Sequence, residues 1–347
     1  MHPPASSTCV VDVHTHFMPL GLPDFAEQHG DPRWPRLVAS GSGGGEIRRG
    51  PKVFRTVERS CFDIDERLEQ MDRFGVDTQV ISPVPVTLTY WADGGLADEY
   101  ARRQNDALAD AASRSGGRLL AFAGVALQDP ELAIRELERA VTQLDMRGVE
   151  IGASVGSDEL DAVGLRDFFA AASDLGARLL VHPLEGGAAI GRPGSVLTAF
   201  GVGMLTDTTF AATALVFGGV LEELPDLKIV LSHGGGSFCS CFPRLRFRHL
   251  LDHPEPELEA AAVDARTRGL FVDSIVFDPF MLGVLRQRFG ADHVLLGSDY
   301  PFKSWEPPGP DDIFARAVDQ RVLEPDDRDQ MRGPNALAFL GLAPTER

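Results

Sequence analysis

The chain has 347 residues, 33 of them basic and 51 acidic, and its formal net charge of −18 argues against a surface that binds nucleic acid or anionic membranes. An apolar fraction of 44% supplies a full hydrophobic core, and the length is ordinary for an α/β barrel with insertions. Residues 1–8 lack the basic start and the apolar run of a signal peptide, and no segment approaches the length of a membrane span, so we expect a cytoplasmic protein.

The first predicted element is a buried strand over residues 10–17, and it ends in two histidines. Residues two apart on a strand point to the same side, so His14 and His16 project together. Neutral imidazoles that converge at this spacing supply two ligands for a divalent metal. Two polar residues near a turn would give the same pattern by chance, so the rest of the chain has to decide between these interpretations.

A long insertion without a regular hydrophobic period follows, from about residue 19 to residue 62. It contains a glycine-rich run and a basic patch made of Arg48, Arg49, Lys52 and Arg55. Loops of this length are usually either functional or disordered. Two interpretations stay open: an irregular excursion with a solvated charge run, or a lid that carries cations to an anionic ligand.

Strand and helix patterns alternate through the rest of the chain. Short apolar runs, typical of parallel strands buried on both faces, cover residues 77–83, 119–125, 148–152, 178–183, 228–233, 269–274 and 293–299. Helical spacing covers residues 65–74, 97–114, 129–144, 165–175, about 206–224, 238–251 and 279–289, and continues to residue 340. The alternation predicts an α/β fold, a single (β/α)8 TIM barrel over residues 1–347. A doubly wound open sheet is the second choice, because no Gly-x-Gly-x-x-Gly turn follows the first strand.

Residues with metal-binding side chains stand at the C-terminal ends of four predicted strands. They are His14 and His16 on the first strand, His182 on the fifth, His233 on the sixth and Asp299 on the eighth. In a barrel these ends form one mouth, where active sites lie. Their convergence predicts a metal site. His293, by contrast, starts the eighth strand and belongs to the opposite face.

We expect this site to hold one ion. Two-metal barrels of this kind often use a carboxylated lysine at the end of the fourth strand as a bridge, whereas the fourth strand here, residues 148–152, contains no lysine. Three histidines and one aspartate with an open coordination position suit a catalytic Zn²⁺. Mn²⁺ accepts the same ligands, and the spacing does not choose between the two ions.

Several runs of sequence resemble the amidohydrolase superfamily and, within it, the 2-amino-3-carboxymuconate-6-semialdehyde decarboxylase family. The resemblance covers nearly the whole chain. It rests on Asp12-Val-His-Thr-His-Phe-Met-Pro, Phe54-Arg, Met71-Asp-Arg-Phe-Gly-Val-Asp, Val181-His-Pro, Ser232-His-Gly-Gly-Gly-Ser-Phe and Gly297-Ser-Asp-Tyr-Pro-Phe. The last two runs are the most specific.

The resemblance implies a role for each matching position. The metal ligands would be His14, His16, His182 and Asp299, and His233 would be the acid–base residue beside a metal-bound water. Arg55 would bind a substrate carboxylate and Phe302 would pack against the substrate. Arg244 matches an arginine that in the family reaches into the site of the neighbouring subunit, which implies a homodimer.

One departure concerns the substrate. The family typically has a tryptophan after the His-Pro pair of the fifth strand, whereas this chain has Leu184, and residues 185–209 do not follow the family pattern. This loop would line the mouth of the barrel. The class of chemistry therefore carries over more readily than the substrate.

The sequence thus predicts a metal-dependent non-oxidative decarboxylase of an unsaturated or aromatic carboxylic acid. Arg55 and Arg244 would clamp carboxylates, and His233 with Asp299 would move the proton. Hydrolysis or hydration of an acidic small molecule by the same metal hydroxide is the second interpretation. A non-catalytic metal-binding protein is the third, and a missing ligand or base would mark it. The expected partner is a small carboxylate, with neither nucleic acid nor membrane.

Overall fold

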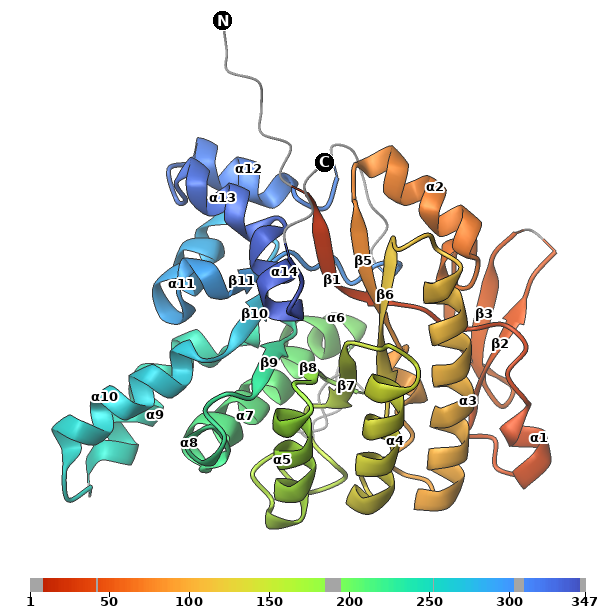
Figure 1. Cartoon of the computed structure of the whole chain (residues 1–347), viewed down its shortest axis with the longest axis horizontal. Helices are drawn as coiled ribbons and strands as arrows, with labels where there is room; N and C mark the ends of the chain where they lie inside the picture. Colours follow the sequence, from red (N-terminus) through yellow and green to blue (C-terminus); the bar gives the residue numbers. More distant parts are fainter. Residues whose placement is uncertain (1–8, 42, 185–194, 252, 303–308, 344–347) are drawn as a thin grey trace, which may run out of the picture.

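Eight parallel strands form the centre of the computed structural model, which describes residues 9–343 except 42, 185–194, 252 and 303–308 (Figure 1). In barrel order they are β1 (Val11–His16), β5 (Thr78–Ser82), β6 (Leu119–Gly124), β7 (Gly148–Gly152), β8 (Arg178–His182), β9 (Lys228–Leu231), β10 (Phe271–Asp273) and β11 (Val294–Leu295). Backbone hydrogen bonds from Val13 N to Leu296 O and from Asp299 N to His14 O, each 2.9 Å long, bring the last strand back to the first. The predicted (β/α)8 TIM-barrel fold is confirmed.

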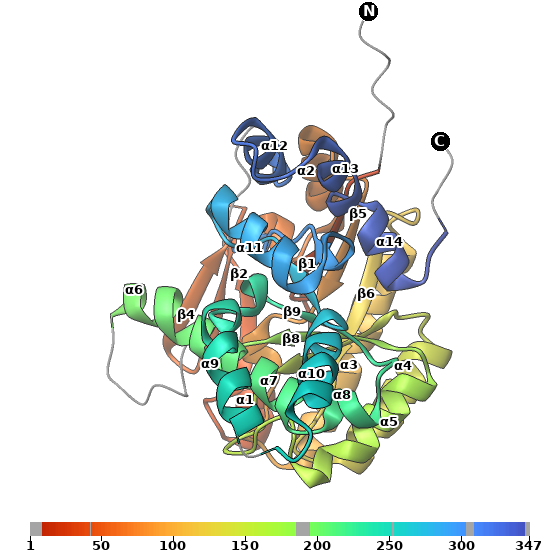
Figure 2. The same ribbon diagram turned by 90° about the vertical axis from the view of Figure 1, so that its left-hand side faces the viewer.

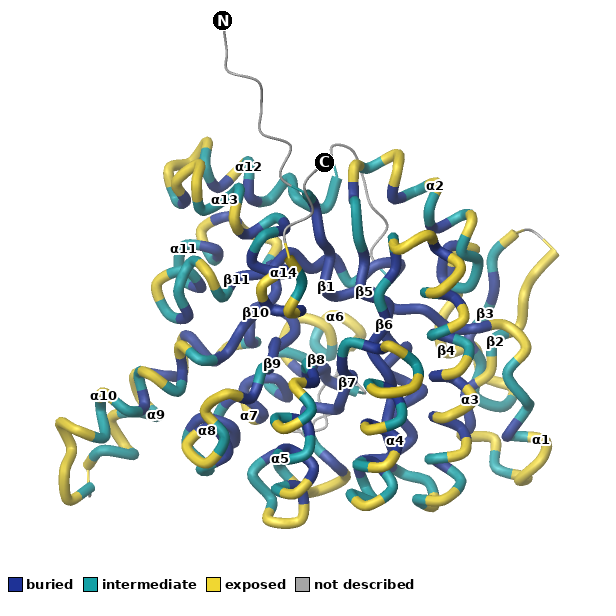
Figure 3. The backbone as a smooth tube through the Cα atoms, in the orientation of Figure 1, coloured by how far each residue is buried: buried dark blue, intermediate teal, exposed yellow. Residues whose placement is uncertain are grey.

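Helices cover the outside of the barrel, with their buried faces toward the strands (Figure 3). The longer ones are α2 (Ile64–Phe74), α3 (Gly94–Ser113), α4 (Pro130–Thr142), α5 (Arg166–Asp174), α7 (Met204–Phe217), α9 (Phe238–Leu251), α10 (Pro256–Arg268), α11 (Pro279–Phe289) and α12 (Asp312–Asp319). Shorter helices, α13 (Pro325–Met331) and α14 (Pro334–Leu340), complete the chain. Local signals explain the ends: the Asp63 carboxylate accepts from Glu66 N at the start of α2, and Gly75 ends that helix at a φ of 67°.

The predicted helix over residues 206–224 is not continuous. The structure has α6 (Val196–Thr198), a π-helical turn (Ala199–Gly203), α7, and then a break before α8 (Val220–Glu223). The break occurs where Gly219 adopts a φ of 91°, a conformation that favours glycine.

One apolar helical stretch corrects the expectation that no segment approaches the length of a membrane span. Val196–Phe217 has 22 residues and is long and apolar enough by length and composition. Half of its most apolar window is nevertheless buried inside the protein, and Ala211 and Leu215 pack into the main core. Packing against the barrel accounts for the buried half of this apolar stretch.

The insertion after β1 is largely regular, which contradicts one of the two interpretations left open, the irregular excursion. It contains α1 (Phe25–His29) and an antiparallel sheet of β2 (Pro35–Ala39), β3 (Gly45–Arg49) and β4 (Lys52–Val57). Gly50, at a φ of 56°, forms the tight turn between β3 and β4. A small core of its own, which includes Ile47, fixes the sheet to the barrel. Figure 2 shows β4 on the same side of the barrel as α6.

Candidate metal centre and active site

The strand ends bring the predicted histidines together inside the mouth of the barrel. The imidazole Nε2 atoms of His14 and His16 lie 3.2 Å apart, and Asp299 Oδ1 lies 3.2 Å from His16 Nε2 and 3.8 Å from His14 Nε2. The ring of His182 lies 5.0 Å from that of His14 and 5.1 Å from that of His16, centroid to centroid. Side-chain donor atoms of His14, His182, His233 and Asp299 all lie within 4.8 Å of one another.

The donor set matches what a divalent cation requires. His16 Nδ1 bonds the carbonyl oxygen of Pro83, and His182 Nδ1 bonds that of Pro183, each at 2.7 Å. A hydrogen on each Nδ1 leaves the Nε2 atom with a lone pair that faces the cluster. His182 Nε2 is buried and has no hydrogen-bond partner in the described part of the chain. Converging lone pairs next to a carboxylate are stabilised by a cation, which these residues could hold.

Burial and neighbouring charges set the protonation of these groups. Burial, together with the neighbouring His233, lowers the pKa of His182 well below its ordinary value. Burial lowers the pKa of His233 as well, although Asp273 and Asp299 oppose that effect. Burial would raise the pKa of Asp299, but the hydrogen bond to His16 and the surrounding imidazoles hold it below its usual range. The site therefore favours neutral imidazoles at His182 and His233 and a charged carboxylate at Asp299.

Asp273, at the end of β10, is the main residue that the sequence analysis missed. Its Oδ2 lies 2.6 Å from His14 Nδ1 and accepts from His233 N at 2.9 Å, and its Oδ1 accepts from Gly234 N at 2.8 Å. Burial disfavours a charge on His14, but the Asp273 carboxylate, together with the charges of Asp299 and Glu150, outweighs burial and raises the pKa of His14 to about 9. Asp273 thus orients a candidate ligand and also anchors the turn that carries His233. Asp273 stands at the C-terminal end of the seventh barrel strand, as the predicted ligands do on their own strands. That position is the sequence signal that could have identified it.

The turn after β9 explains the three glycines that follow His233. His233 has a φ of 55°, and Gly234, Gly235 and Gly236 have φ values of 63°, 74° and 64°. A Cβ atom on Gly236 would lie 2.2 Å from the carbonyl oxygen of Leu205. The chain can therefore fold back and place the His233 ring 5.5 Å from that of His14 and 5.0 Å from that of His182 only with glycines after it.

Two further buried acids lie close to the cluster. Asp12 accepts from Ser298 N at 3.1 Å and from Ser298 Oγ at 2.5 Å, which fixes the segment that carries Asp299. Glu150, on β7, has Oε2 3.7 Å from His16 Nδ1, and burial raises its pKa to about 7. Glu150 stands on the fourth barrel strand, residues 148–152, which has no lysine to bridge two metal ions.

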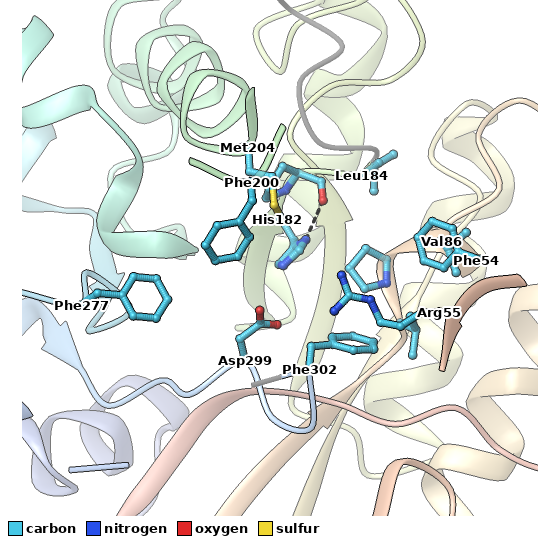
Figure 4. Close-up of a pocket in the computed structure, with 13 residues that line it drawn as sticks. Phe54, Arg55, Val86, His182, Leu184, Phe200, Met204, Phe277, Asp299 and Phe302 are labelled. Atoms are coloured by element: carbon cyan, nitrogen blue, oxygen red, sulfur yellow. Dashed lines mark hydrogen bonds between the residues drawn. The ribbon is translucent and has the colours of Figure 1, made fainter. Parts of the chain in front are cut away.

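A cavity of about 380 Å³ opens from the cluster (Figure 4). Its described lining consists of Phe54, Arg55, Val84, Pro85, Val86, His182, Pro183, Leu184, Phe200, Met204, Phe277, Asp299 and Phe302. Arg55 and Phe302 lie on one wall, with the guanidinium carbon 4.9 Å from the ring centroid, and Phe200 and Phe277 lie on the opposite wall. The Phe302 ring also lies 5.4 Å from the His16 ring. The cavity suits a flat apolar body with an acidic group.

The other predicted residues lie elsewhere. Arg244 is exposed on α9 and is absent from the described lining of the cavity. His293 packs its ring 4.2 Å from that of Phe271, away from the cluster. Leu184 lines the cavity. Residues 185–194, which belong to the loop that does not follow the family pattern, lie outside the described residues.

Comparisons with known proteins agree with this geometry. The sequence model of a family described as amidohydrolase matches residues 11–342. A 2-amino-3-carboxymuconate-6-semialdehyde decarboxylase of Dictyostelium discoideum is 33% identical over 344 residues, which cover 97% of this chain and 92% of the relative. A gamma-resorcylate decarboxylase of a Polaromonas species is 30% identical over 263 residues, 69% of this chain and 77% of the relative. The crystal structure of a dihydroxybenzoic acid decarboxylase from Polaromonas, with bound manganese and the inhibitor 2-nitroresorcinol, matches with a TM-score of 0.74 at 23% identity and covers 96% of this chain and 97% of that one.

Proposed function

The chain belongs to the amidohydrolase family, and from this premise we propose that it is a metal-dependent non-oxidative decarboxylase of an unsaturated or aromatic carboxylic acid. The observation that carries the proposal is the buried cluster of imidazoles and Asp299, which opens directly into a cavity with aromatic walls and Arg55. Relatives named as decarboxylases of aromatic and unsaturated acids support it.

One divalent ion would be held by His14, His16, His182 and Asp299. The unpartnered Nε2 atom of His182 and the close approach of the His14 and His16 Nε2 atoms support this set. Zn²⁺ suits three histidines and one carboxylate, and Mn²⁺, which the Polaromonas structure contains, suits them as well. When bound, the ion polarises coordinated oxygens and lowers the pKa of coordinated water.

His233 would be the acid–base residue. It is buried beside the cluster, and neither ring nitrogen has a hydrogen-bond partner in the described structure, although His233 is absent from the described lining of the cavity. In the reaction the bond between the substrate carbon and its carboxyl group breaks, CO2 leaves, and the electron pair stays on the carbon. His233 would then deliver a proton to that carbon and recover one from water. Burial lowers the pKa of His233 and favours the neutral imidazole, whereas the charges of Asp273 and Asp299 oppose that effect.

Arg55 and Phe302 would hold the substrate. Apart from His182, Arg55 is the only basic side chain in the described lining of the cavity, and a guanidinium can bind a carboxylate in bidentate fashion. Phe302 offers a flat apolar surface beside it. Because Arg55 lies on β4, the insertion of residues 19–62 would act as a lid within one barrel domain.

Arg244 would act in the site of a neighbouring subunit, which makes the enzyme a homodimer. Its exposed position on α9, outside the cavity of its own chain, supports this role. Mixing Arg55→Ala with Arg244→Ala subunits should restore part of the activity, since one hybrid site would keep both arginines. No recovery in verified mixed dimers would contradict a shared site. The free cysteines Cys61, Cys239 and Cys241 support a cytoplasmic location.

Hydrolysis or hydration of an acidic small molecule is the second candidate function, because the same ion, His233 and Arg55 would also serve it. Metal-loaded protein should be incubated with a panel of hydroxybenzoic and unsaturated dicarboxylic acids, and with esters and amides of the same acids. Release of CO2 in amounts equal to the decarboxylated product supports the proposal. Addition of water without CO2 release would replace it by the second function.

A further inference from the structure

The cavity beside the metal-binding cluster has two unlike walls (Figure 4). Arg55 stands on one wall, and Phe200 and Phe277 stand on the wall across from it. Apart from Arg55, His182 and Asp299, every side chain in the described lining is apolar. A charged group that faced Phe200 and Phe277 would therefore lose its water without gaining a polar partner from that wall, which is unfavourable.

An irregular turn of helix carries Phe200. Residues Ala199–Gly203 form a π-helical turn between α6 and α7. Turns of this kind are rare, and they occur frequently at functional sites. The Phe200 side chain is 49% exposed, and it lines the cavity that opens from the metal-binding cluster. The irregular backbone thus coincides with a residue that can contact a ligand.

A strained turn carries Phe277. This residue follows β10 and has a φ of 58°, in the left-handed region that bulky side chains rarely adopt. Hydrogen bonds on both sides maintain the turn, from Val276 N to Ser274 O at 2.9 Å and from Asp278 N to Val276 O at 2.8 Å. Backbone conformations of this kind cluster at ligand-binding sites, where the surrounding structure holds them in place. Phe277 lines the same cavity as Phe200.

The two rings meet although their segments follow different barrel strands. Phe200 comes after β8 and Phe277 after β10, and their ring centroids lie 6.0 Å apart at an interplanar angle of 48°. Aromatic rings attract each other at this separation. Two independent backbone irregularities therefore place two aromatic rings side by side at one cavity. Aromatic side chains in such a position commonly contact a ligand.

We propose that Phe200 and Phe277 are specificity-determining residues that select single-ring aromatic acids with an apolar edge. A cavity of about 380 Å³ is at the small end of the range for ligand sites and suits one ring. The acidic groups of the substrate face Arg55 and the metal site, and its apolar edge lies against Phe200 and Phe277. A second charged group at that edge is rejected. The inference rests on the proposed function in that this cavity is the substrate site.

The test is calorimetric titration of the metal-loaded protein with matched ring-substituted 2-hydroxybenzoates. The two acids of each pair carry a methyl group or a second carboxylate at the same ring carbon, meta or para to the first carboxylate. We expect the wild type to prefer the methyl acid about tenfold or more at one of these positions, because the carboxylate would be desolvated there. Phe277→Arg should reverse that preference, because a guanidinium binds the added carboxylate.

Milder substitutions provide a second measurement if Phe277→Arg folds poorly. Phe200→Leu and Phe277→Leu should each weaken binding of the preferred methyl acid by about three- to tenfold, since each removes an aromatic contact. The double variant should lose less than the product of the two effects, because the rings touch each other. Phe210→Leu on α7 and Phe280→Leu on α11 are matched controls, because both residues are exposed and absent from the described lining of the cavity.

Equal affinity of the wild type for both acids of every pair would overturn the inference, as would failure of every acid to bind. A loss of affinity in the controls as large as in Phe200→Leu and Phe277→Leu would also overturn it. Because the titration measures binding, its result is separate from that of the decarboxylation assay. CO2 release without the methyl preference would contradict the selectivity alone, and the methyl preference without CO2 release would contradict the proposed function alone.

Discussion

The rim of the barrel and the insertion sheet contribute to one cavity in different ways. The rim histidines His14, His16 and His182 are buried, and backbone carbonyls or carboxylates fix their rings. The insertion contributes Arg55 from the exposed strand β4. The barrel thus supplies rigid positions for a metal and a proton, and the insertion supplies an adjustable contact to an acid. Changes at the rim should therefore affect chemistry and metal binding, and changes in the insertion should affect substrate affinity.

The largest expected effect is at His233. Replacement by asparagine, His233→Asn, removes the acid–base group and should lower kcat by roughly 10²- to 10⁴-fold while the metal content stays the same. Steady-state kinetics with metal analysis would measure both quantities. His293→Asn is the control, because His293 is a histidine outside the cluster. Full activity in His233→Asn would remove this residue from the mechanism.

Asp273 should show the next effect. Asp273→Asn removes the charge that orients His14 and should weaken metal affinity by roughly 10- to 100-fold, as is usual when a carboxylate behind a metal ligand is lost. Competition with a chelator would measure this. Asp292→Asn is a matched control, since Asp292 also pairs with a histidine, His293, but far from the rim. Equal metal affinity in the two variants would show that Asp273 acts only in folding.

Substitution of Arg55 tests whether the insertion contributes to substrate affinity. Arg55→Gln should raise KM about tenfold, corresponding to roughly 1.4 kcal/mol of binding free energy, and leave metal content and thermal stability unchanged. The control is Arg48→Gln, because Arg48 pairs with Glu46 on the same sheet and does not line the cavity. A change in metal content with an unchanged KM would contradict the assignment of Arg55 to substrate binding.

The last expected effect is a pH dependence of stability in the metal-free protein. The folded-state pKa of His182 lies well below its ordinary value of 6.5, so below pH 6.5 the unfolded chain takes up a proton that the folded chain does not. The stability of the folded state therefore falls as the pH falls below 6.5, by at most about 1.4 kcal/mol per pH unit for this residue. Thermal unfolding between pH 7 and pH 5 should show a smaller decrease for His182→Asn than for the wild type. Parallel decreases in both proteins would contradict this contribution.

The convergence of the rim residues could be predicted from the sequence. Strand register and barrel topology determine where His14, His182, His233 and Asp299 meet. Parallel strands are short apolar runs, and their polar ends stand out against them. Asp273 and Glu150 were not identified, because the position of an acid on a strand does not by itself distinguish a buried partner of an imidazole from a solvated side chain.

The insertion was harder to predict for a physical reason. Its strands β2, β3 and β4 are short, and β2 and β4 are largely exposed, so the insertion lacks the continuous apolar runs of the core strands.

The central claim is that one ion lies among His14, His16, His182 and Asp299. Anomalous diffraction from crystals of the protein loaded with Zn²⁺ or Mn²⁺, with metal analysis of the same sample, tests it directly. We predict one ion per chain, about 2.0–2.2 Å from an imidazole nitrogen of each histidine and from an Asp299 carboxylate oxygen. An ion outside this cluster, or a second ion of full occupancy bound by Glu150, would contradict the account.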